Sequence, residues 1–135
     1  MKLSRACGYA LRSLVYLARR DGAGPVPAVQ IAEAEGLPER FLGKVLKPLV
    51  SAQVLLSLRG PNGGYRLARP ARGITLLEVV EAVDGPVRGE TPRWAATAGG
   101  KLNSRLQRVC DAGAEEVRGS LQKVSLAYLA GKGAG

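Results

Sequence analysis

The fold is decided by residues 37–70, which read LPERFLGKVLKPLVSAQVLLSLRGPNGGYRLARP. The first half of this stretch has apolar residues at helical spacing. They are Phe41, Leu42, Val45, Leu46 and Leu49. Pro38 fits the first turn of that helix. Pro48 removes a backbone N–H, so we expect a kink or an early helix end there.

The second half of the stretch predicts a β-hairpin. Two β-rich runs, 54–58 and 64–68, flank the sequence PNGG. Asn62-Gly63 favours a tight turn because both positions tolerate positive φ. The glycines do not match a phosphate-binding loop, since the lysine and the following helix of that motif are missing. The acidic residues also form no paired arrangement typical of catalysis. The sequence therefore does not favour an enzyme.

Helices are expected on both sides of this stretch. The apolar spacing predicts one over 4–20, a second between Pro27 and Gly36, and a third from Thr75, with Glu78 completing a capping box, to 85. A last amphipathic helix is expected over about 101–123. Its apolar seam is Leu102, Leu106, Val109, Gly113, Val117, Leu121 and Val124.

This order predicts a mainly α fold with a small β-hairpin, namely a winged helix-turn-helix followed by a long C-terminal helix. We expect a winged helix-turn-helix domain over 1–84 and a loop or linker over 85–100. A dimerisation helix should cover 101–130 and a flexible tail 131–135.

Composition points to a polyanionic partner. The 135 residues suit one domain, and 20 Lys and Arg against 11 Asp and Glu give a net charge of +9. Residues 1–70 hold 11 of those basic residues and 4 of the acidic ones. Histidine is absent and only two cysteines are present, so we expect no metal site and no cofactor. No apolar run approaches the length of a membrane span, and we expect a cytoplasmic protein.

A helix-turn-helix places the start of its second helix in the major groove of DNA. Here that position holds Glu39, Arg40, Gly43 and Lys44. Arg40 could contact guanine or a phosphate, whereas Lys44 and Lys47 are expected on phosphates. Arg59 on the hairpin suits a narrow A·T minor groove. Each of these charges could instead be an ordinary solvated surface group.

Four segments together resemble the Rrf2 family of bacterial transcriptional regulators. They are MKLSRACGYALRSLVYLA, GPVPAVQIAEAEGLPERFLGKVLKPLVSAQVLLSLRGPNGGYRLARP, ITLLEVVEAVDGP and VSLAYL. The family includes an iron–sulphur cluster assembly regulator, a nitric-oxide-sensing repressor and a cysteine-metabolism repressor. The resemblance implies a homodimer in which the long helices cross, and a palindromic operator in double-stranded DNA.

The resemblance also implies DNA-backbone contacts at the start of the first helix, and base contacts by Arg40 and Gly43. Many relatives have a glutamate where Gly43 stands. The full expected DNA-binding set is Ser4, Arg5, Tyr9, Glu39, Arg40, Gly43, Lys44, Lys47, Arg59, Gly60 and Asn62.

Cluster-binding relatives carry three cysteines in the loop before the long helix, and this chain has neither cysteine nor histidine there. We therefore expect a regulator, acting as a repressor, without an iron–sulphur cluster. Cys7 fits a packed thiol on the first helix. Cys110 fits interface packing or a redox-active thiol that changes DNA affinity. The alternatives are a redox-thiol regulator acting through Cys110, a winged-helix module for a protein partner, and binding to nucleic acid through charge alone.

Overall fold

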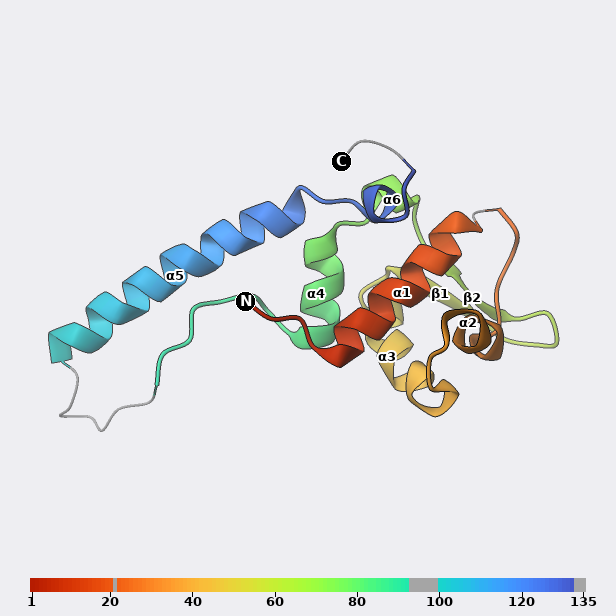
Figure 1. Ribbon diagram of the computed structural model, residues 1–135, viewed down its shortest axis with the longest axis horizontal. Coiled ribbons are helices and arrows are strands. Elements are labelled where there is room, and N and C mark those ends of the chain that lie inside the picture. The colour runs from red at the N-terminus through yellow and green to blue at the C-terminus, as the bar shows by residue number, and fades with distance from the viewer. Residues whose placement is uncertain (21, 93–99, 133–135) are drawn as a thin grey trace.

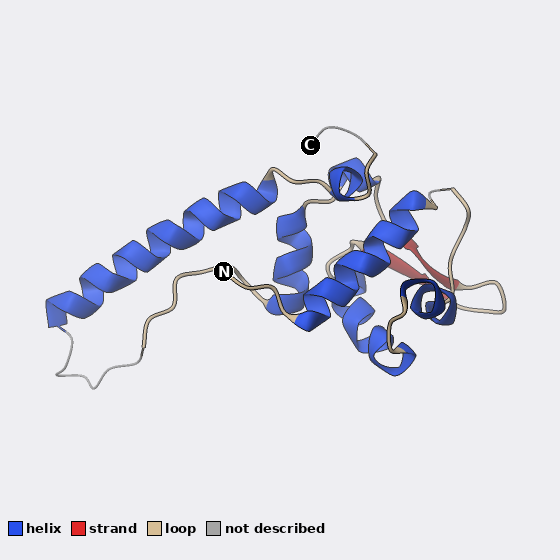
Figure 2. Ribbon diagram, in the orientation of Figure 1, coloured by secondary structure: helices blue, strands red, loops and turns tan. Residues whose placement is uncertain are grey.

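The computed structural model describes residues 1–20, 22–92 and 100–132. Helices and one hairpin follow the order of a winged helix-turn-helix (Figures 1 and 2). The elements are α1 (Arg5–Arg19), α2 (Ala28–Glu35), α3 (Glu39–Ser51), β1 (Leu55–Leu58), β2 (Gly64–Leu67), the 3-10 turn η1 (Ala71–Gly73), α4 (Leu76–Asp84), α5 (Gly100–Gln122) and α6 (Leu126–Leu129). The predicted fold class is confirmed. Among the described residues, no helix has the length and apolarity to cross a membrane.

Helix α1 begins where the sequence predicts, because Ser4 caps it. The Ser4 Oγ accepts a hydrogen bond from the Cys7 backbone N–H at 3.0 Å. The buried face is Cys7, Ala10, Ser13, Leu14, Leu17 and Ala18. Ser13 was absent from the apolar pattern, and it is tolerated because its Oγ donates to the Tyr9 carbonyl at 2.8 Å.

The turn between α2 and α3 is three residues long. Gly36 ends α2 with a φ of 65°, a left-handed conformation that glycine adopts without steric cost. Leu37 then inserts into the core, only 7% exposed. This short connection sets the angle between the two helices of the motif.

Helix α3 continues through Pro48 to Ser51, so the expected early end is wrong. An interior proline costs about 3 kcal/mol. Four buried side chains, each contributing about 1.5–3 kcal/mol, outweigh that cost. They are Leu42, Val45, Leu46 and Leu49. Phe41, assigned to the same apolar face by the pattern, is 49% exposed instead.

The hairpin pairs Leu55 with Leu67 and Leu58 with Gly64 in antiparallel register. Its connection is not the Asn62-Gly63 turn that the sequence predicts. Positive φ falls on Gly60 (103°) and Gly64 (143°), and the Gly63 N–H donates to the Gly60 carbonyl at 3.0 Å. Pro61 and Asn62 therefore occupy the centre of the turn, where proline presets φ at the first position.

Two glycines of the hairpin are required by close backbone approach. A Cβ on Gly63 would lie 2.2 Å from the Leu58 carbonyl oxygen, and a Cβ on Gly64 would lie 2.4 Å from the Val26 backbone. Val26 pairs with Tyr65 through hydrogen bonds of 2.9 and 2.8 Å. The hairpin is thereby fixed against the segment that precedes α2.

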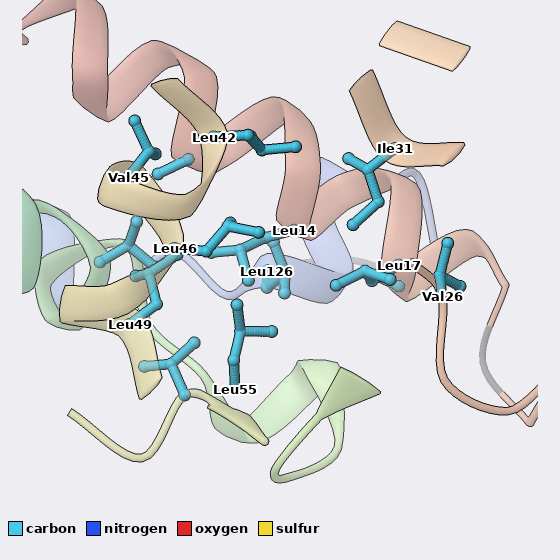
Figure 3. Close-up of a cluster of buried hydrophobic side chains, with 14 of the residues drawn as sticks. Leu14, Leu17, Val26, Ile31, Leu42, Val45, Leu46, Leu49, Leu55 and Leu126 are labelled. Atoms are coloured by element: carbon cyan, nitrogen blue, oxygen red, sulfur yellow. The ribbon is translucent and has the colours of Figure 1, made fainter. Parts of the chain in front are cut away.

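Helix α5 agrees with the amphipathic helix expected over about 101–123, but the longer dimerisation helix expected over 101–130 is divided in the structure. Helix α5 ends at Gln122, and residues 124–126 then return to the domain: the Leu76 N–H donates to the Val124 carbonyl and the Leu126 N–H to the Ile74 carbonyl, both at 2.8 Å. Leu126 is 1% exposed among the side chains of α1 and α3 (Figure 3). The core of the domain therefore includes residues beyond α5.

Residues 130–132 bind the end of α1 rather than forming part of a free tail. The Lys132 Nζ donates to the Ala18 carbonyl at 2.6 Å, and the Arg19 Nε donates to the Ala130 carbonyl at 3.2 Å. A cation at a helix C-terminus also stabilises the helix dipole. The rest of the predicted tail, 133–135, lies outside the described residues.

Candidate nucleic-acid interface

The outer face of α3 is basic and solvent-exposed. Arg40, Gly43, Lys44 and Lys47 are all exposed. Their spacing of three and four residues places them on one side of the helix. Glu39, also exposed, lies in the first turn, where a carboxylate stabilises the helix dipole. The helix thus presents three cations around one glycine.

Gly43 leaves open space at the centre of this face. A Cβ built on it would have no heavy atom within 4 Å. Its backbone conformation does not require glycine either. Because Gly43 has no side chain, another molecule can approach the helix backbone between Arg40 and Lys47.

The hairpin loop carries the next group of predicted residues. Arg59, Gly60 and Asn62 are all exposed. Figure 1 shows the loop at one end of the molecule and α5 at the other. Arg59 directly precedes the turn that the hydrogen bond between Gly63 and Gly60 closes.

The start of α1 holds Ser4, Arg5 and Tyr9. The Ser4 backbone N–H donates to the Asp84 carboxylate at 3.1 Å, and the Ser4 hydroxyl donates to the same carboxylate. Ser4 is thus engaged in capping and in linking α1 to α4. Arg5 is exposed and Tyr9 is half-buried against the core. The DNA contacts of these three residues stay predictions.

Arg69 anchors the hairpin, a role that sequence reasoning missed. Its guanidinium donates to Glu78 Oε1 at 2.7 Å, to the Gly73 carbonyl at 2.8 Å and to the Gln53 carbonyl at 3.3 Å. It therefore joins the segment that follows β2 to the start of α4 and to the turn after α3. An arginine directly after a strand, followed nine residues later by a capping glutamate, was the available signal.

Glu78 is the acidic centre of this network. Burial raises the pKa of its carboxyl, but the hydrogen bonds and charge of Arg69 and the hydrogen bonds of Thr75 outweigh burial and hold the pKa below its usual value. A lowered pKa means that the charged form stabilises the fold. This stabilisation is present above the unfolded-state pKa and is lost as the pH falls through the folded-state pKa.

We expect Glu78→Gln to lower the free energy of unfolding by about 1 kcal/mol at neutral pH, because it weakens the capping box and the bond to Arg69. Urea unfolding should show this difference shrinking as the pH falls through the pKa of Glu78. Glu115→Gln is the matched control, since that carboxylate is 81% exposed. A difference independent of pH would contradict the assignment.

The two cysteines lie in different surroundings. Cys7 is fully buried, and this burial, with a smaller effect of Asp84, raises the pKa of its thiol to about 11. Cys110 is half-buried on α5, where the Gly89 backbone lies against it so closely that a Cβ on Gly89 would be 2.5 Å from the Cys110 carbonyl carbon. Gln107 holds this crossing by donating to the Gly89 carbonyl at 2.9 Å.

Cys7 should therefore resist alkylation in the native protein. A pKa raised by about two units lowers the thiolate fraction roughly 100-fold, and burial adds to that protection. Iodoacetamide labelling followed by mass spectrometry should modify Cys7 only after unfolding. Native labelling of Cys7 at the rate of a free thiol would show that the core opens around α1.

The described residues offer few side chains of the types that ligate an iron–sulphur cluster. Such a cluster needs several thiolates or substitute ligands. Cys7 belongs to the core and Cys110 to α5, and within the described ranges no three residues of the types His, Cys, Asp and Glu lie close enough to hold a metal ion. The chain has no further cysteine and no histidine.

The chain resembles known regulators in sequence and in structure. The model of the Rrf2 family, described as iron-dependent transcriptional regulator, matches residues 3–132. A putative HTH-type transcriptional regulator of Mycobacterium tuberculosis is 32% identical over 97% of this chain and 82% of its own length. The HTH-type transcriptional regulator IscR of Escherichia coli is 36% identical over 64% of this chain and 54% of its own. The structure of CymR, the global cysteine regulator of B. subtilis, matches with a TM-score of 0.75, 28% identity and 99% coverage of both chains.

Proposed function

Because this chain belongs to the Rrf2 family and is a DNA-binding transcriptional regulator, we propose that it acts as a homodimeric, sequence-specific repressor that uses no iron–sulphur cluster. The exposed basic face of α3, together with the exposed arginine of the hairpin loop, carries this proposal. We assign base contacts to Arg40 and Gly43, phosphate contacts to Lys44 and Lys47, and a minor-groove contact to Arg59.

Helix α5 supports the homodimer. None of its residues, all of which the structure describes, is buried. Leu102 is 59% exposed and Val109 70% exposed. An amphipathic helix of 23 residues gains stability by covering such a stripe, and a second copy of α5 supplies a complementary one. A twofold dimer would match a palindromic operator.

Selection of bound sequences from random double-stranded DNA tests the proposal. We expect an enriched palindrome that binds at least ~10³-fold more tightly than random DNA at physiological salt. The protein should also lower transcription from a promoter that overlaps this palindrome. Equal and steeply salt-dependent affinity for all sequences would instead indicate binding through charge alone.

We expect the purified protein to contain no iron–sulphur cluster, even after anaerobic preparation. Two cysteines per chain, one of them in the core, cannot supply a normal ligand set. Iron analysis and visible absorbance spectra of the DNA-binding dimer check this. Stoichiometric iron with a visible absorption band would contradict it.

A further inference from the structure

A partly open groove lies between α1, α3 and α4. Its volume is about 410 Å³, within the size range of small-molecule sites. Apolar side chains form most of its lining, namely Ala6, Tyr9, Phe41, Val45, Pro48 and Val83. Residues from three helices therefore converge on a space whose walls favour a hydrocarbon body.

Phe41 is the most unusual of these residues. Its helix buries Leu42 and Val45, yet Phe41 is 49% exposed. Exposed aromatic surface next to a cavity loses contact with water when an apolar ligand binds. Pro48 lies about two helical turns beyond Phe41, and its ring adds apolar surface to the same wall of the groove.

Two cations stand at the groove, Arg5 from α1 and Lys44 from α3. Both side chains are exposed, and within the described part of the chain neither forms an ion pair with a carboxylate. Apolar walls beside two cations complement a ligand that has a carboxylate head and an apolar body.

We propose that this groove binds a small apolar carboxylate and that the bound ligand releases the protein from DNA. The second part rests on the proposed function, in which Lys44 contacts a DNA phosphate, and on the backbone contact predicted for Arg5. A carboxylate paired with these side chains withdraws two cations from the phosphates, which lowers DNA affinity. The groove thus couples a ligand directly to the DNA-binding face.

Calorimetric titration of the full-length protein with octanoate tests the site. Octanoate should bind once per chain, whereas 1-octanol, which lacks the charge, and acetate, which lacks the chain, should bind at least ~10-fold more weakly. Phe41→Ala should weaken octanoate binding by a similar factor. Tyr128→Ala is the matched control, because that ring is 51% exposed but lies outside the groove.

Methyl NMR spectra of the wild-type protein locate the ligand without any variant. Octanoate should shift the methyl signals of Val45 and Val83, which line the groove, and leave those of Val29 unchanged. Equal binding of all three probes, or shifts that avoid Val45 and Val83, would overturn the site. Shifts that avoid Val45 and Val83 are also expected if a segment of the partner subunit fills the groove in the dimer, and that result would likewise overturn the site.

DNA release is measured separately, on the complex with the selected operator. Octanoate at saturating concentration should lower the apparent affinity at least ~10-fold, and 1-octanol should not. Octanoate that binds at Val45 and Val83 without releasing DNA would overturn the coupling. A protein that selects no operator but still binds octanoate in the groove would refute the proposed function and leave the site standing.

Discussion

Substitution of Arg59 by alanine should weaken operator binding by about 1–3 kcal/mol for each Arg59 that contacts the DNA. It should also relax the preference for A·T pairs beneath the hairpin loop. The loop that carries Arg59 is narrow. Its Gly63 backbone lies so close to Leu58 that a Cβ on residue 63 would be 2.2 Å from the Leu58 carbonyl oxygen. Val26 pairs with Tyr65 beside this loop, and Arg69 fixes the opposite end of the hairpin. A narrow minor groove concentrates negative potential, so loss of the guanidinium has its largest effect there.

Fluorescence anisotropy at constant salt checks this result, using the selected operator and a second DNA in which the flanking A·T pairs are replaced by G·C. Arg66→Ala is the matched control, since Arg66 is an exposed arginine of the same hairpin outside its loop. It should change affinity less and leave the A·T preference intact. Wild-type affinity and footprint in Arg59→Ala would remove Arg59 from the interface.

Val109→Glu should convert the dimer to a monomer and remove most of the affinity for a palindromic operator. Val109 is 70% exposed on α5, at the centre of the seam that we assign to the partner helix. In the dimer the substitution would place two carboxylates against apolar surface, where burial of an unpaired charge is strongly unfavourable. A monomer engages one half-site at a time and loses the gain from simultaneous binding.

Sedimentation velocity and operator titration measure the two effects on the same preparation. Ser104→Glu is the control. It adds the same charge to an exposed position of α5 five residues away, which is about 140° around the helix. It should stay dimeric. A dimeric Val109→Glu protein would place the interface elsewhere.

Local patterns predicted the parts of the fold that depend on neighbouring residues. The helix end at Gly36 and the cap at Thr75 each follow from a glycine or a side chain that acts within one turn, and both are found in the structure. The helix order and the hairpin followed from spacing alone. The basic face of α3 was predictable for the same reason, because four positions on one helix define a side without any tertiary information.

The remaining features depend on contacts between distant segments. Helical spacing cannot tell a buried Phe41 from one that borders a groove, since α1 and α4 decide the outcome. The Asn62-Gly63 signal was overridden because a longer loop lets Pro61 start the turn. Pro48 remained helical because tertiary burial of α3 exceeds its local cost.

The return of residues 124–132 to the domain has a consequence for synthesis on the ribosome. Leu126 and Ala130 fill the core formed by α1, α3 and the hairpin, and they are translated only after α5. Domains generally fold as units as the chain emerges. A nascent chain that has reached only α4 lacks these side chains, so the helices and hairpin before α5 gain full stability only when α5 has also been made. Incomplete chains are thereby less stably folded than the finished protein.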